Sequence, residues 1–96
     1  MPRAKPPPAD DLRERRRKLH EDVEGHGVPV ADAIKRMRQA LGLTQTQFGR
    51  VFKLTVRQVW ELEAGTANPT LSTLTRLAKP FGFQPGFILL NHPPNA

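Results

Sequence analysis

Residues 44–65 read TQTQFGRVFKLTVRQVWELEAG, and this stretch decides the fold. It contains two capping boxes, in which a threonine is followed three residues later by a glutamine: Thr44 with Gln47, and Thr55 with Gln58. At this spacing the hydroxyl and the amide satisfy backbone groups at the start of a helix. The stretch therefore predicts two short helices in close succession.

The apolar residues after these caps repeat at helical spacing. Those expected in the core are Phe48, Val51 and Phe52 in the first helix, and Val59 and Leu62 in the second. Gly65 suits the end of the second helix, and Phe52-Lys53-Leu54 separates the two helices. Two helices joined by so short a turn form a helix-turn-helix, whose second helix can present its exposed face to a DNA major groove.

A further helix is expected on each side of this pair. Before it, the apolar residues at helical spacing are Ile34, Met37 and Leu41. Gly42 suits the end of that helix. After it, residues 66–69 form a loop, Thr70 caps a helix, and Pro80 ends or kinks it. The apolar residues of this last helix are Leu71, Leu74, Leu77 and Ala78. The sequence thus predicts an all-α domain of four to five helices.

The C-terminal segment allows two structures. We favour a short fifth helix over residues 84–90, with Pro85 at its first position. The alternative is an extended strand that pairs with a second copy of the chain. Residues 91–96 are expected to form a polar tail.

The N-terminal part differs in composition. Residues 1–9 hold four of the ten prolines and predict an arm without regular structure. Residues 10–23 are rich in helix formers, and their only large apolar residues are Leu12, Leu19 and Val23. So thin a stripe gives a marginal helix that needs a partner surface, and Gly25-His26-Gly27 is expected to break it. We therefore expect an arm and marginal helix over residues 1–29 and a folded domain over residues 30–90.

The charge of the chain points to a polyanion. Fifteen Lys and Arg against nine Asp and Glu give a net charge of +6. Residues 1–29 are nearly balanced, with seven basic and six acidic side chains, whereas residues 30–96 carry eight basic and three acidic ones. The excess therefore lies in the expected folded domain, which favours nucleic acid as a partner. A solubilising surface charge is the alternative.

Several function classes are excluded. Without cysteine the chain has no disulfide, thiolate metal site or cysteine nucleophile. The three histidines, His20, His26 and His92, lack ligand spacing, and Ser72 has no histidine and carboxylate placed to complete a triad. We therefore expect no catalytic residues, metal or cofactor. No apolar run is long enough for a membrane helix, and no secretory signal opens the chain, so a cytoplasmic location is expected.

Residues 33–90 resemble the lambda-repressor-like, or XRE, helix-turn-helix family. The matching stretches are Ile34 to Arg38, Gly42 to Gln45, Gln47 to Gly49, Val59 to Gly65, Asn68 to Leu71 and Leu74 to Leu77. The resemblance implies a regulator that binds double-stranded DNA in a sequence-specific manner. It places base contacts at Val56, Arg57 and Glu61. These side chains suit a thymine methyl, a guanine edge and a cytosine amine respectively. The alternative for Arg57 and Glu61 is a surface ion pair, and both roles can hold together.

The resemblance also implies contacts to the DNA backbone. The candidate residues are Thr44, Gln45, Arg50, Lys53, Gln58, Thr66 and Asn68. It further implies a buried structural salt bridge between Arg38 and Glu63. Two positions depart from the family pattern, since Lys53 replaces a glycine in the turn and Gly49 replaces an alanine. Trp60 lies about 100° from the centre of the buried arc; we favour a half-buried packing role over contact with the DNA backbone.

The C-terminal segment holds more large apolar residues than so small a domain can cover. We expect a homodimer through this segment, with Phe83, Phe87, Ile88 and Leu90 at the interface. Two hypotheses follow. The first is a transcriptional regulator, a repressor, that acts as a dimer on a palindromic operator. The second is the antitoxin of a toxin–antitoxin pair, which binds a small toxin through residues 1–29 and regulates its own promoter.

Overall fold

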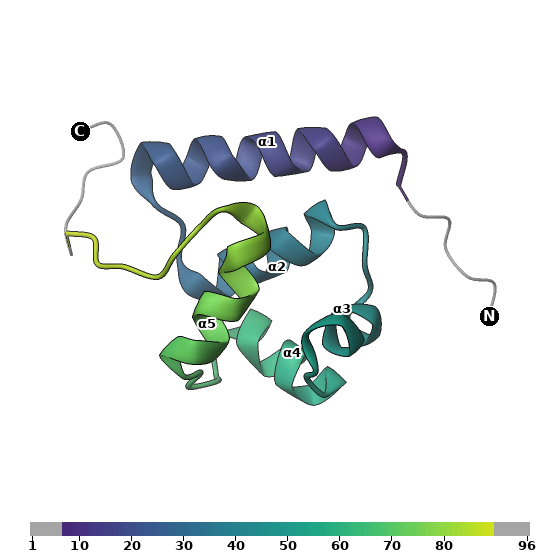
Figure 1. Cartoon of the computed structure of the whole chain (residues 1–96), viewed down its shortest axis with the longest axis vertical. Coiled ribbons are helices and arrows are strands. Elements are labelled where there is room, and N and C mark those ends of the chain that lie inside the picture. The colour runs from purple at the N-terminus through teal and green to yellow at the C-terminus, as the bar shows by residue number, and fades with distance from the viewer. Residues whose placement is uncertain (1–6, 90–96) are drawn as a thin grey trace.

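The computed structural model describes residues 7–89 and is all-helical over that range. The elements are α1 (Ala9–His26), α2 (Val30–Ala40), α3 (Gln45–Phe52), α4 (Val56–Ala64), α5 (Leu71–Ala78) and the 3₁₀ turn η1 (Lys79–Phe81). The long helix α1 lies across α2, α3 and α4 lie on the far side of α2, and the end of α5 with η1 reaches toward α1 (Figure 1). The prediction of an all-α fold is confirmed.

Both capping boxes form as expected. Thr44 and Thr55 accept hydrogen bonds from the backbone N–H of Gln47 and Gln58, and both glutamine side chains reciprocate. Gly65 ends α4 in the left-handed conformation, with φ 77°. The start and end of α3 and α4 are therefore set by local hydrogen bonds.

The core has two clusters that meet at α2. The first lies within α2 to α5 and consists of Ile34, Phe48, Phe52, Val59, Leu62 and Leu77. The second joins α1 to α2, α5 and η1 and consists of Leu19, Met37, Ala40, Ala78 and Phe81. Helix α2 contributes to both clusters, and this positions the helix-turn-helix against the rest of the chain.

Val51 was expected in the core and is exposed instead, and Leu71, an apolar residue of the last helix, is exposed as well. In α3 the neighbouring α4 packs on the side of Gly49, where a Cβ would lie 3.6 Å from Val59. Val51 projects from the opposite side of the Phe48–Phe52 stripe and is left facing solvent. Leu71 is the first residue of α5 and lies beyond the surface that the other helices cover.

Helix α1 is longer and more firmly attached than the sequence indicated. It continues through Gly25 and ends only at Gly27, whose φ of 76° closes it. The helix therefore ends within the Gly25-His26-Gly27 stretch that was expected to break it, and Gly25 itself keeps helical geometry with no atom near the position of a Cβ. Leu19 is fully buried, so α2, α5 and η1 supply the partner surface that this helix was expected to need.

Polar contacts add to this attachment. Arg15 donates to the carbonyl of Gln39 on α2, and Arg16 donates to the carbonyl of Pro80 in η1. Asp22 pairs with Arg36 of α2 at 2.8 Å and with Lys18 at 3.2 Å. These cations hold the pKa of the Asp22 carboxyl below its usual value, Arg36 having the larger effect.

The helix expected over residues 84–90 does not form. Residues 83–89 are neither helix nor strand, and Leu90 lies outside the described residues. Gly82, with φ 76°, turns the chain after η1, and Phe83 then stacks on Phe81 and lies against His20. So short a helix is marginal without covering contacts, and Gly86 near its start weakens it further.

Candidate nucleic-acid interface

The turn between α3 and α4 sets the angle of the two helices. Lys53 takes the left-handed conformation, with φ 58° and ψ 45°. The backbone N–H groups of Lys53 and Leu54 both donate to the carbonyl oxygen of Gly49, the second at 2.7 Å. The departure from glycine at position 53 thus places a lysine side chain on the outside of the turn, where it is exposed.

A largely buried ion pair joins α4 to α2. Arg38 donates two hydrogen bonds to the Glu63 carboxylate, at 2.7 and 2.9 Å, and a third to the carbonyl of Leu43. Only 6% of the Glu63 side chain is exposed. Gln45, the first residue of α3, donates to the same carboxylate at 3.3 Å. This network joins three helices, and it orients the start of α3 relative to α4.

The outer face of α4 carries the three candidate base-contact residues. The Arg57 side chain is 84% exposed, and its Nε donates to the Glu61 carboxylate at 3.0 Å. Val56 begins the helix and is half-exposed. Arg57 and Glu61 therefore form the surface ion pair that the sequence analysis gave as their alternative role. The rest of the guanidinium group remains accessible to solvent.

The candidate backbone-contact residues belong to α3, α4 and the segments next to them, and most of them are exposed. Thr44, Arg50 and Lys53 are exposed on or beside α3. Gln58, Thr66 and Asn68 line one hollow between α4 and the start of α5. The N–H groups of Thr66 and Ala67 donate to the carbonyl of Glu61, which folds this loop onto the end of α4.

Fewer of the basic side chains around α4 are paired with carboxylates than of those on α1. On α1, Arg17 pairs with Glu14 and Glu21, which raises the pKa of Arg17 and lowers that of Glu14. Within residues 7–89, Arg50 and Lys53 take part in no ion pair. The cations beside α4 are therefore available to phosphate, whereas many of those on α1 are matched by carboxylates.

The sequence predicts a half-buried Trp60, and in the structure the residue is 57% exposed on α4. Its angle on the helix placed it at the edge of the buried arc. That signal alone does not show whether a neighbouring element reaches over the ring. In the structure the ring stays open beside the candidate base-contact residues.

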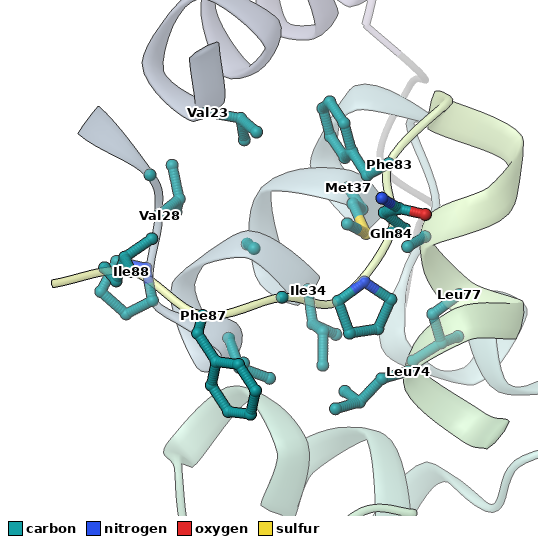
Figure 2. A pocket seen from close by; sticks show the side chains of 17 residues that line it. Val23, Val28, Ile34, Met37, Leu74, Leu77, Phe83, Gln84, Phe87 and Ile88 are labelled. Atoms are coloured by element: carbon teal, nitrogen blue, oxygen red, sulfur yellow. The ribbon is translucent and has the colours of Figure 1, made fainter. Parts of the chain in front are cut away.

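The residues expected at a dimer interface divide into two groups. Phe83 packs within its own chain against His20 and Phe81. Phe87 is fully exposed and Ile88 is mostly exposed, as is the neighbouring Leu89, while Leu90 lies outside the described residues. Figure 2 shows the C-terminal segment crossing an apolar groove, with Ile34 and Met37 of α2 beneath it and Leu74 and Leu77 of α5 beside it. The volume of this open groove is about 370 Å³.

Two further findings concern the described residues. None of the helices between residues 7 and 89 has the length and apolar character needed to cross a membrane. Over the same range, no group of three or more His, Asp or Glu side chains is placed to hold a metal ion.

The sequence profile of the Helix-turn-helix family matches residues 34–88, more than half of the chain. The chain therefore belongs to the XRE, or lambda-repressor-like, helix-turn-helix family, which consists of DNA-binding transcription regulators. The resemblance drawn from the sequence is confirmed. No curated protein and no solved structure matches the chain.

Proposed function

We propose that this regulator is a repressor that binds a palindromic operator as a homodimer, with α4 in the major groove. The observation that carries the proposal is the exposed face of α4, held by the Arg38–Glu63 pair. Arg57 on this face can bond the O6 and N7 atoms of guanine, and Glu61 and Val56 extend the same surface. Exposed cations at Arg50 and Lys53 flank it toward the phosphates.

The repressor assignment is tested with a duplex selected by the purified protein from a random-sequence pool. The selected site is placed between a promoter and a reporter gene. Expression should fall when the wild-type protein is supplied and should recover with Arg57→Ala. A rise in expression with the wild type would instead identify an activator.

The dimer is proposed to form through the C-terminal segment. Phe87, Ile88 and Leu89 form an exposed apolar run, and Phe87 and Ile88 line the groove of Figure 2. So much apolar surface is typical of an interface. A second copy is the proposed occupant, because a two-fold dimer places two α4 helices about 34–36 Å apart, the spacing of successive major grooves.

Sedimentation at micromolar concentration tests this arrangement. The wild type should be a dimer, and Phe87→Asp should be a folded monomer with much weaker operator binding. Leu71→Asp is the matched control, since Leu71 is another exposed apolar residue outside the segment. A Phe87→Asp protein that remains dimeric contradicts the proposed interface.

The alternative function, an antitoxin, rests on residues 1–29 as a segment that wraps a toxin. Most of this segment is α1, and Leu19 of α1 is already committed to the core of the same chain. This packing supports the regulator as the first proposal. Co-purification of a second small chain, encoded beside this one, would favour the antitoxin.

A further inference from the structure

Trp60 is the single tryptophan of the chain, and its ring is exposed on α4. Among residues 7–89 it has no aromatic or cation–π partner. One exposed apolar side chain needs no explanation by itself. Trp60 does not stand alone, however, because Val56 lies one turn earlier on the same side of α4 and is also half-exposed.

The position of Trp60 on α4 is fixed by its neighbours. At about 100° per residue, Glu63 and Arg57 lie about 60° from Trp60 on opposite sides of the helix. Glu63 receives a hydrogen bond from Gln45 at the start of α3. Trp60 therefore lies between the start of α3, a candidate phosphate contact, and Arg57, a candidate base contact. An occupant that touches both sites must pass over Trp60.

The neighbouring charges leave the ring uncovered. Arg57 lies between Trp60 and Glu61 around the helix, and its bond to Glu61 draws the guanidinium away from the ring. Arg50 and Lys53 are exposed on the same helix-turn-helix and take part in no ion pair within residues 7–89, which favours a polyanion over an apolar protein surface. In the major groove of duplex DNA, the apolar group that an exposed aromatic ring can contact is the C5-methyl of thymine.

We propose that Val56 and Trp60 form an apolar ridge that contacts thymine methyl groups in the operator, so that Trp60 is a specificity-determining residue. This inference rests on the proposed function and deepens it. The polar residues of α4 and this ridge would then read different parts of the site: Arg57 a guanine edge, and the ridge a run of methyl groups beside it.

Fluorescence gives the first test, because Trp60 is the only tryptophan and the chain has no tyrosine. The probe is the duplex selected by the wild-type protein from a random pool. Its addition should shift or quench the tryptophan emission and saturate with the binding curve. Emission that stays unchanged while the duplex binds overturns the inference.

Replacing thymine by uracil gives the second test, since it removes only the methyl group. At each contacted position the wild type should bind the uracil duplex about three- to fourfold more weakly, the factor for one buried methyl-sized group. Trp60→Ala should lose this discrimination, and Trp60→Phe should retain much of it. The measured quantity is the ratio of the two affinities, in which general losses of stability cancel.

Val56 has a matched control in Val30. Each is a valine at the first position of a helix, α4 and α2 respectively, and each is 50% exposed. Val56→Ala should lower the thymine-to-uracil ratio, and Val30→Ala should leave it unchanged.

The possible outcomes distinguish a failure of the proposed methyl contact from a failure of the proposed DNA-binding function. If Trp60→Ala binds the selected duplex and discriminates thymine from uracil as the wild type does, the ridge does not read methyl groups. A ridge that is free for a protein partner would give that same result, together with unchanged emission. If the wild type selects no duplex at all, the proposed function itself fails.

Discussion

The carbonyl oxygen of Leu54 lies 2.5 Å from the place where a Cβ on Gly49 would stand. The helix-turn-helix of this protein is therefore closed by backbone packed against backbone. The same glycine accepts the N–H groups of Lys53 and Leu54 through its own carbonyl. The turn between α3 and α4 can therefore be this sharp only because residue 49 has no side chain.

Gly49→Ala should destabilise the protein by about 1–3 kcal/mol, because the added methyl group meets backbone that cannot move aside cheaply. Gly25→Ala is the control. Gly25 lies within α1 with nothing near its absent Cβ, so alanine there should stabilise by about 0.5–1 kcal/mol. Urea unfolding measures both changes. An alanine at position 49 that stabilises the protein would show that the turn relaxes freely.

Replacing Lys53 should move stability and DNA binding in opposite directions. Its left-handed backbone costs about 1 kcal/mol with a side chain present, so Lys53→Gly should raise the free energy of unfolding by about that amount. Loss of the ammonium group should weaken binding to all duplexes alike. Unfolding and binding to selected and scrambled duplexes are measured together. Unchanged binding to both duplexes would remove Lys53 from the phosphate contacts.

The Arg38–Glu63 pair should be costly to break. Either Arg38→Ala or Glu63→Ala strands a buried charge and should destabilise by about 3–5 kcal/mol, whereas a methionine–leucine double replacement should be far milder. The exposed pair Arg57–Glu61 supplies the control, and alanine at either position should cost less than about 1 kcal/mol. Equal losses for the two pairs would contradict the buried role of the first.

Asp22 should make stability depend on acid pH. Arg36 and Lys18 hold the pKa of its carboxyl below the unfolded value of about 3.9. The carboxylate therefore contributes stability above the unfolded pKa, and this contribution is lost as the pH falls through the lower folded pKa. Asp22→Asn should show a smaller loss of stability between neutral pH and pH 2 than the wild type. Parallel curves for the two proteins would exclude this contribution.

The sequence predicted α3 and α4 well because their limits are set within a few residues. The hydroxyl of Thr55 needs only the N–H of Gln58, and Gly65 needs only its own conformational freedom. The burial of Leu19 against α2 and η1 depended on contacts far along the chain. A thin apolar stripe shows that a partner is needed, but it does not say which one.

The exposure of the candidate site residues was predicted only in part. Helical angles separated Arg57 from the core, because the two sides of a short helix differ in polarity. They left Trp60 at the boundary, where exposure depends on how far the neighbouring elements reach. The path of Phe83 after Gly82 was not predictable, since it follows from stacking on Phe81 and contact with His20.

The Arg57 side chain should carry sequence preference rather than general affinity. Arg57→Ala should relax the preference at one base pair by about 1–3 kcal/mol and leave binding to a scrambled duplex nearly unchanged. Competition between the selected duplex and its single-base variants measures this. A uniform loss across all variants would make Arg57 a phosphate contact only.

The central claim is that residues 44–68 bind duplex DNA through phosphate and base contacts. The most direct test is the affinity of the wild type for its selected duplex between 50 and 200 mM salt. With about six phosphates contacted, the affinity should fall by roughly a thousandfold over this range. An affinity that does not change with salt would contradict the claim.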